Sequence, residues 1–213
     1  MSERTALAEQ NPTVISDALA ALAAGEAIVY PTETFYALGV DALSLNALER
    51  LFAIKGREPG KPVALIAANL TMAFAVARDV PVQARVLAEA FWPGPLTLVL
   101  PARDGIPAAL IGGDGGVGVR VSSHPIARAL AAGFGGPLTA TSANLAGALP
   151  AVELDAARRT LGDKVKVLVD GGGLAGGAPS TVVAVDRAGM RVLRPGAVSE
   201  RQLAAALTAG APR

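Results

Sequence analysis

Hydrophobic positions along the chain follow two patterns that alternate with each other. Apolar residues at helical spacing predict helices over residues 14–24, 45–55, 72–77, 81–91, 125–132, 152–161 and 200–208. Short, nearly continuous apolar runs predict strands over residues 27–30, 35–40, 62–68, 96–100, 117–121, 138–141, 165–169, 181–185 and 190–193. Because strands and helices alternate over most of the length, the pattern predicts an α/β domain with a mixed sheet.

The chain shows no internal repeat, low-complexity linker or break in composition. We therefore expect a single domain over residues 13–208, with flexible termini at 1–12 and 209–213. The uncharged run 62–77 is interrupted by Asn69 and Thr71 and is shorter than the roughly 20 apolar residues of a membrane-spanning helix. The first residues lack the apolar core of a signal peptide, so we expect a cytoplasmic protein.

The composition excludes several kinds of catalytic and metal-binding site. The chain of 213 residues is 52% hydrophobic and carries 19 basic against 18 acidic residues, for a net charge of +1. No overall positive field would therefore attract nucleic acid. Cysteine is absent and histidine occurs once, which excludes thiolate metal sites, cysteine nucleophiles and multi-histidine metal sites. No metal-binding residues are predicted. Most of the basic residues are arginine, which binds planar anions through two parallel hydrogen bonds.

Two glycine-rich segments match the dinucleotide pattern G-x-G-x-x-G without its structural context. They are Gly113–Gly118 and Gly171–Gly176, and each leads into a predicted strand rather than a helix. The pattern requires a helix N-terminus to receive the pyrophosphate, so a dinucleotide cofactor is not favoured. The phosphate-binding pattern G-x-x-x-x-G-K-[ST] is also missing.

Several segments nevertheless concentrate anion-binding or hydroxyl side chains. Lys55, Arg57 and Lys61 place three cations in a loop with glycine and proline, which suits a polyphosphate. The alternative is that cations complement the C-terminal dipole of the preceding helix, which does not account for Lys61. The segment Tyr30–Tyr36 follows a buried strand with clustered hydroxyls, and taken alone it is more typical of a turn that satisfies its own backbone.

Further candidates follow later strands. Hydroxyls and an amide cluster at Thr139–Asn144, and ligands of α/β sheets bind beyond strand ends. Ser180 follows a glycine-rich loop that would allow close approach of the backbone to a phosphate. Arg120 lies within a strand, where an anionic ligand and a structural salt bridge are equally good explanations. For His124, which precedes a predicted helix, a capping or exposed position is favoured over catalysis.

Seven motifs, in this order along the chain, together resemble the YrdC-domain family of threonylcarbamoyl-AMP synthases, in its short single-domain form. The motifs are Tyr30–Gly39, Lys55–Arg57, Trp92–Thr97, Val119–Val121 with His124-Pro125, Thr141–Asn144, Ser180–Val182 and Leu193–Gly196. The resemblance runs from about residue 13 to residue 208. It implies an open, twisted mixed sheet with flanking helices around a basic concave cavity.

The resemblance also implies a reaction and its site. L-threonine, bicarbonate and ATP would give L-threonylcarbamoyl-AMP and pyrophosphate, with Mg²⁺ carried on the ATP phosphates. Other proteins would transfer the threonylcarbamoyl group to adenosine 37 of tRNAs that decode ANN codons. The threonine site would comprise Thr34, Arg120, Ser180 and the backbone at Ala140. The ATP site would comprise Arg57, Lys61, Ser142, Arg194 and the backbone at Gly116, with Asn144 and Lys55 beside it; Lys55 and Arg57 would stabilise phosphate charge, and no general base is assigned.

The chain departs from the family pattern at several positions that bear on substrate choice. Ala37 replaces a usual glycine, Ile66 stands where many members carry a histidine near the threonine, and Pro150 stands where others place a serine on the nucleotide. These departures leave open a relative that makes another carbamoyl or acyl adenylate. A module that binds tRNA or double-stranded RNA without catalysis is the other alternative, although the net charge of +1 argues against it.

Overall fold

The computed structural model describes residues 12–56, 62–145 and 147–210. Its helices are α2 (Pro12–Ala23), α3 (Leu45–Lys55), α4 (Leu70–Phe74), α5 (Val82–Phe91), α6 (Pro125–Phe134), α7 (Leu154–Leu161) and α8 (Glu200–Ala209). Its strands are β1 (Ile28–Pro31), β2 (Tyr36–Gly39), β3 (Leu65–Ala67), β4 (Leu96–Pro101), β5 (Gly116–Val121), β6 (Leu138–Thr139), β7 (Thr141–Ser142), β8 (Val167–Leu168), β9 (Thr181–Asp186) and β10 (Gly189–Arg194). Each predicted helix and strand is present, with bounds that shift by a few residues.

The predicted α/β class with an open, mixed strand arrangement is confirmed, but the strands form two mixed sheets where a single sheet was expected. One sheet has the order β7-β2-β1-β8 and the other has the order β10-β9-β4-β5-β3-β6. Parallel pairs in the larger sheet are β4 with β9 and β3 with β5, and its remaining pairs are antiparallel. The run predicted as one strand over 138–141 divides at Ala140, and its two halves, β6 and β7, join different sheets.

Thr139 connects the two sheets at this division. Its backbone nitrogen donates to the carbonyl of Val40 at 3.1 Å, and its Oγ1 accepts from the nitrogen of Val40 at 3.0 Å. The hydroxyl of Tyr30 in β1 donates to the carbonyl of Thr139 at 2.8 Å. All three residues are fully buried. The chain that leaves Thr139 toward β7 is therefore held in a fixed position between the sheets.

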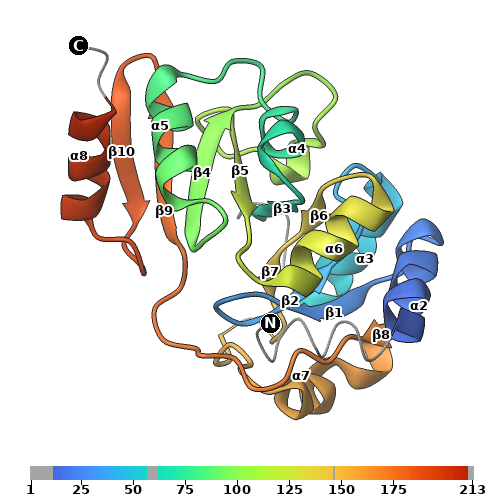
Figure 1. Cartoon of the computed structure of the whole chain (residues 1–213). Coiled ribbons are helices and arrows are strands. Elements are labelled where there is room, and N and C mark those ends of the chain that lie inside the picture. Colours follow the sequence, from blue (N-terminus) through green and yellow to red (C-terminus); the bar gives the residue numbers. More distant parts are fainter. Residues whose placement is uncertain (1–11, 57–61, 146, 211–213) are drawn as a thin grey trace.

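Helices cover the outer faces of the sheets (Figure 1). Helices α5 and α8 lie side by side beside β9 and β10, while α2 packs against α6 at the other end of the molecule. The buried side chains form two apolar clusters, a larger one that spans both sheets and a smaller one around Tyr30, Ile66 and Leu130.

Local signals in the sequence set several element boundaries. Ser44 caps α3 by accepting from the nitrogen of Ala47, and Gly56 ends it in the left-handed conformation at φ 59°. Ser199 and Gln202 form the predicted capping box of α8. In the part of the chain that the structure describes, no helix has the length and apolarity needed to cross a membrane.

Candidate functional site

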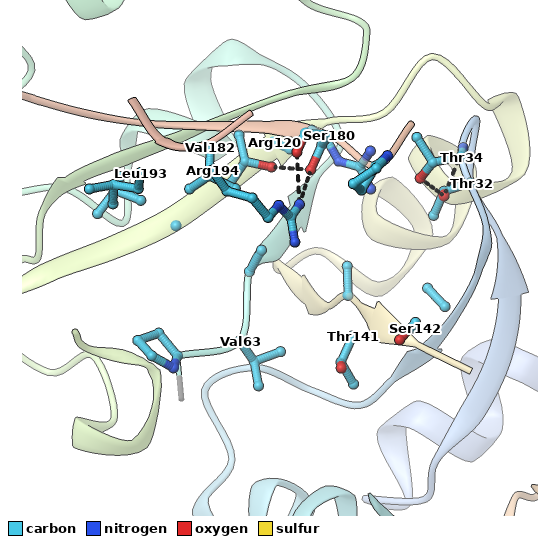
Figure 2. A pocket seen from close by; sticks show the side chains of 18 of the residues that line it. Thr32, Thr34, Val63, Arg120, Thr141, Ser142, Ser180, Val182, Leu193 and Arg194 are labelled. Atoms are coloured by element: carbon cyan, nitrogen blue, oxygen red, sulfur yellow. Dashed lines mark hydrogen bonds between the residues drawn. The ribbon is translucent and has the colours of Figure 1, made fainter. Parts of the chain in front are cut away.

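A cavity of about 550 Å³ lies between the two sheets. It falls within the size range of small-molecule sites. Figure 2 shows Leu193 at one end and Thr32 and Thr34 at the other, with Arg194 between them and Thr141 and Ser142 on the opposite wall. The described residues that line it are Thr32, Thr34, Phe35, Tyr36, Ala37, Pro62, Val63, Ala64, Thr97, Val99, Gly112, Asp114, Gly116, Gly118, Arg120, Ala140, Thr141, Ser142, Pro150, Pro179, Ser180, Val182, Leu193 and Arg194.

The polar segment after β1 forms a closed turn at one end of the cavity. Thr32 Oγ1 donates to the carbonyl of Phe35 at 2.7 Å and accepts from the nitrogens of Thr34 and Phe35, each at 3.3 Å. The interpretation of this segment as a turn that satisfies its own backbone is therefore correct for Thr32. The Oγ1 atoms of Thr32 and Thr34 lie 3.1 Å apart, so the turn also fixes the hydroxyl of Thr34 on the cavity wall.

Arg120 enters the cavity from the buried strand β5. Its guanidinium forms an ion pair with Glu33 at 2.5 Å, and both side chains are only 8% exposed. The other carboxylate oxygen of Glu33 accepts a hydrogen bond from the hydroxyl of Ser122. The structural salt bridge is therefore present, and Arg120 also lines the cavity, so an anionic ligand for it stays a prediction.

Arg194, the last residue of β10, is the second guanidinium in the cavity. Its Nη2 donates to the carbonyl of Ser180 at 2.7 Å and to the hydroxyl of Ser180 at 3.1 Å. That hydroxyl also lies 3.0 Å from Oγ1 of Thr97. Burial lowers the pKa of Arg194, and the positive charge of Arg120 lowers it further. The electrostatic potential at Arg194 therefore favours an anion.

Gly196 has no side chain, which allows the segment Leu193–Gly196 to pass close to the backbone at Ser180. A Cβ at this position would lie 2.3 Å from the carbonyl oxygen of Pro179 and 2.6 Å from the carbonyl carbon of Ser180. The chain after β10 therefore passes against the backbone that carries Ser180, which a larger residue would prevent. The nitrogen of Ala197 donates to the carbonyl of Pro179 at 2.9 Å and closes this contact.

Lys55, the last residue of α3, holds the segment that follows β7. Its Nζ donates to the carbonyl of Ser142 at 2.8 Å, to the carbonyl of Asn144 at 2.5 Å and to Oδ1 of Asn144 at 3.0 Å. The hydroxyl of Ser142 also donates to Oδ1 of Asn144, and the side-chain amide of Asn144 donates to the carbonyl of Ala148. Lys55 and Asn144 are both buried, so the ammonium group organises this wall of the cavity.

The predicted site residues thus fall into three groups. Those that line the cavity are Thr34, Gly116, Arg120, Ala140, Ser142, Ser180 and Arg194. Lys55 and Asn144 support Ser142 from behind. Arg57 and Lys61 lie outside the described residues, so their placement stays a prediction.

The sequence departures and the remaining motifs also have defined places. Ala37 and Pro150 line the cavity, whereas Ile66 is fully buried in the smaller apolar cluster. His124 is buried and caps α6, where its Nδ1 accepts from the nitrogen of Ile126 at 3.3 Å. Of the two positions expected for it, the capping role is confirmed and the exposed position is wrong, because His124 is fully buried.

The start of the glycine-rich loop before β9 is held by a tyrosine of β2. The hydroxyl of Tyr36 accepts from the nitrogen of Gly171 at 3.0 Å and lies 2.8 Å from the carbonyl oxygen of Gly172. A Cβ at Gly171 would lie 2.5 Å from Pro31. The first glycine of the loop thus permits close packing against β1.

Two acidic residues of this region were not predicted from the sequence. Glu33 pairs with Arg120, and its place between two threonines in a turn was the available signal. Asp114 lines the cavity within a run of glycines for which the sequence predicted only a backbone contact, at Gly116. Within the described residues, no group of three or more His, Asp and Glu side chains has the geometry of a metal site.

Comparison with known proteins places this chain in a family. The family model of the Sua5, YciO and YrdC proteins, described as "Telomere recombination", matches residues 20–196. The threonylcarbamoyl-AMP synthase of Pyrococcus abyssi is 37% identical over 172 residues, which are 81% of this chain and 51% of that protein. A putative threonylcarbamoyl-AMP synthase of Mycobacterium tuberculosis is 37% identical over 199 residues, which are 93% of this chain and 91% of that protein.

Solved structures agree with the sequence comparison. The crystal structure of P. abyssi Sua5 complexed with L-threonine superposes with a TM-score of 0.86 at 34% identity, covering 91% of this chain and 57% of that one. E. coli YciO superposes with a TM-score of 0.80 at 29% identity, covering 89% of this chain and 92% of that one. The chain therefore spans about half the length of the P. abyssi protein and nearly all of YciO.

Proposed function

Because the chain belongs to the Sua5/YciO/YrdC family, we propose that it forms L-threonylcarbamoyl-AMP and pyrophosphate from L-threonine, bicarbonate and ATP. Relatives that carry the name threonylcarbamoyl-AMP synthase are 32% to 42% identical to it. The proposal covers the substrates, the reaction and the assignment of residues to each substrate.

One structural observation carries the proposal. Two guanidinium groups from different strands, Arg120 and Arg194, meet in a single cavity (Figure 2). Burial lowers the pKa of Arg194, and the nearby charge of Arg120 adds to that effect. Glu33 compensates Arg120, whereas the contacts described for Arg194 are with the oxygens of Ser180. An anionic substrate would remove the remaining repulsion, so the cavity suits the binding of anions side by side.

The order of the side chains along the cavity supports an assignment of each substrate. Thr34, Arg120 and Ser180 lie toward the end with the threonine turn, where Arg120 would bind the carboxylate of L-threonine. Ala140 also lines the cavity, and its backbone would contact L-threonine. Arg194, Ser142 and the backbone at Gly116 would contact ATP. Lys55 and Asn144 would act on ATP through Ser142, and Arg57 and Lys61 remain predicted phosphate ligands.

The chemistry requires two anions to meet. The amino group of threonine first combines with bicarbonate to form a carbamate, with loss of water. A carbamate oxygen then attacks the α-phosphorus of ATP, and the bond to the β-phosphate oxygen breaks to release pyrophosphate. Arg194 would stabilise the charge that develops on the phosphates, and the cavity walls would hold the carbamate in line.

Mg²⁺ would enter this reaction with the nucleotide rather than with the protein. The described residues provide no cluster of acidic or histidine ligands, which fits a cation bound mainly by phosphate oxygens. Such a cation supplies charge neutralisation on the triphosphate. Transfer of the threonylcarbamoyl group to adenosine 37 of ANN-decoding tRNAs would require other proteins, and we propose cytoplasmic tRNA modification as the setting.

Pyrophosphate release tests the proposal. The purified chain is assayed with ATP and Mg²⁺, with threonine and bicarbonate each omitted in turn, and strict dependence on both is expected. Arg194→Met should lower kcat/KM for ATP by at least about tenfold, since a charge-assisted contact is lost. Arg187→Met is the matched control, because Arg187 is 89% exposed and pairs with Asp79 outside the cavity.

Two other outcomes would replace the proposal. Turnover of ATP with a different amino acid would indicate a related carbamoyl or acyl adenylate synthase, consistent with Ala37 and Pro150 on the cavity wall. Salt-sensitive binding of double-stranded RNA or tRNA without any turnover would indicate an RNA-binding module.

A further inference from the structure

Asp114 is the acidic residue among the described lining residues of the cavity. It lies in the turn between Gly112 and Gly116, which is closed by a hydrogen bond of 2.8 Å from the nitrogen of Gly112 to the carbonyl of Gly116. Its Oδ1 accepts from the nitrogen of Gly116 at 3.3 Å, so the carboxylate folds back over its own turn. The turn therefore holds this carboxylate in place without a ligand.

The position of Asp114 along the cavity follows from its neighbours. Its Oδ2 lies 3.6 Å from Nη2 of Arg191. Arg191 is two residues before Leu193 on β10, and Leu193 lies at the end of the cavity away from the threonine turn (Figure 2). Arg194 lies between the two ends. Asp114 thus belongs to the end opposite Thr34, beyond the arginine assigned to the phosphates.

The walls at this end suit a nucleoside better than a phosphate. Added Cβ atoms at Gly112 and Gly116 would both meet Asp114, and they would also meet Pro62 and Val99, respectively. Val182 and Leu193 lie at the same end (Figure 2), so apolar side chains and glycine backbone surround the carboxylate. A carboxylate repels phosphate oxygens, so a triphosphate would keep its charged part near Arg194 and away from Asp114. The parts of ATP that can donate a hydrogen bond to a carboxylate are the 6-amino group of adenine and the hydroxyls of ribose.

We infer that Asp114 selects the nucleoside of the triphosphate by accepting a hydrogen bond from one of these donors. The inference rests on the proposed use of ATP and adds a residue that discriminates among nucleotides. A base with a carbonyl at position 6 would place an acceptor against the carboxylate, and a 2′-deoxynucleotide would lack the ribose donor. In either case the half-exposed carboxylate of Asp114 would lose a donor that ATP supplies, and loss of a hydrogen bond to a charged group discriminates against that nucleotide.

Asp114→Asn is a suitable test because it changes charge and hydrogen-bond direction with little change in shape. The amide oxygen can still accept from the nitrogen of Gly116, so the turn keeps its internal bond. The amide nitrogen then faces the nucleoside as a donor. Asp104→Asn is the matched control, since Asp104 is an exposed acid of the loop before η1 (Ala108–Leu110) and its carboxylate does not line the cavity.

The experiment compares ATP, ITP and 2′-deoxy-ATP in the full chain and in both variants. It measures kcat/KM for pyrophosphate release together with the dissociation constant of each nucleotide by calorimetry. Asp114→Asn should shrink the preference for ATP over ITP, or that for ATP over 2′-deoxy-ATP, by at least about tenfold. A change in the first ratio identifies the 6-amino group as the donor, and a change in the second identifies ribose.

The two readouts separate this inference from the proposed function. Unchanged ratios in Asp114→Asn, with wild-type turnover intact, would overturn the role of Asp114 and leave the synthase reaction standing. Binding preferences that depend on Asp114 in a chain without turnover would support the inference and reject the reaction. A wild-type chain that neither binds nor turns over these nucleotides would reject both.

Discussion

Glu33, in the turn after β1, and Arg120, in β5, form a buried ion pair, although 87 positions separate them in the sequence. Ser122, two residues after Arg120, donates to the second oxygen of the same carboxylate. The pair therefore fixes the direction of a guanidinium that would bind the threonine carboxylate. Glu33 acts on the substrate through Arg120 and is a positioning residue.

Substitution of Glu33 should affect threonine more than ATP. Glu33→Gln leaves Arg120 without a compensating charge and free to turn, so we expect KM for threonine to rise about tenfold while KM for ATP changes less than about twofold. The buried charge left behind should also lower the free energy of unfolding by about 3 kcal/mol. Steady-state kinetics with each substrate varied, and denaturant titration, measure the two effects.

A matched control separates this effect from a general loss of charge. Glu26 pairs with Arg50 at 2.7 Å, but these side chains are 33% and 48% exposed. Glu26→Gln should therefore change stability by less than about 1 kcal/mol and leave both KM values unchanged. Equal increases in KM for threonine and ATP in Glu33→Gln would contradict the positioning role.

Lys55 should be needed for the wall of the cavity even when no substrate is bound. Lys55→Met keeps the aliphatic stem and removes the donor to Ser142 and Asn144, so three oxygens lose a hydrogen bond. We expect the ligand-free protein to lose at least about 2 kcal/mol of unfolding free energy. Denaturation without substrates measures this loss, and Lys164→Met, at an exposed position, is the control. Unchanged stability of ligand-free Lys55→Met would mean that Lys55 acts on the phosphates alone.

Gly196 should be intolerant of even a methyl group. Gly196→Ala would place Cβ 2.3 Å from the carbonyl oxygen of Pro179, so the backbone that carries Ser180 must move. We expect a loss of about 2 kcal/mol in stability. Because Arg194 binds Ser180, pyrophosphate release should fall as well. Gly113→Ala is the control, since an added Cβ there meets nothing within 4 Å. Wild-type stability and kinetics in Gly196→Ala would disprove this close approach.

The sequence was sufficient to predict the helices and strands, but not which strands pair in which sheet. Apolar periodicity and capping residues act locally, which is why α3 from Ser44 to Gly56 and the capping box of α8 could be predicted. The division of 138–141 into β6 and β7 depends on which distant strands accept each half. Thr139 bonds to Val40 and Tyr30, and no local signal announces these partners.

The same distinction holds for the site. The motifs placed Arg120, Ser180 and Arg194 in the cavity, where the structure also has them. Partnerships across the fold were beyond the sequence: the carboxylate that pairs with Arg120 comes from the turn after β1, and Lys55 turns to the oxygens of Ser142 and Asn144. Charge alone suggested phosphate binding for Lys55, whereas its contacts depend on a segment more than 80 residues away.

The two tyrosines of the chain, Tyr30 and Tyr36, should make the protein unfold at alkaline pH. Burial raises the pKa of both phenols above the usual value of about 10. In the unfolded chain each phenol ionises near pH 10, whereas in the folded protein it stays neutral. Unfolding then releases protons, so above about pH 10 stability should fall by up to about 1.4 kcal/mol per pH unit for each tyrosine, with no contribution below that pH.

Phenolate absorbance checks this expectation without interference, because the chain has only these two tyrosines. Phenolate should appear together with the loss of helical circular dichroism, in a single cooperative transition. Tyr30→Phe should reduce the slope of stability against pH by about half, although it also removes the 2.8 Å hydrogen bond to Thr139 and so lowers stability at neutral pH by about 1 kcal/mol. Phenolate that forms near pH 10 while the helices remain intact would show that the hydroxyls are open to solvent, and that the contact between Tyr30 and Thr139 does not join the two sheets.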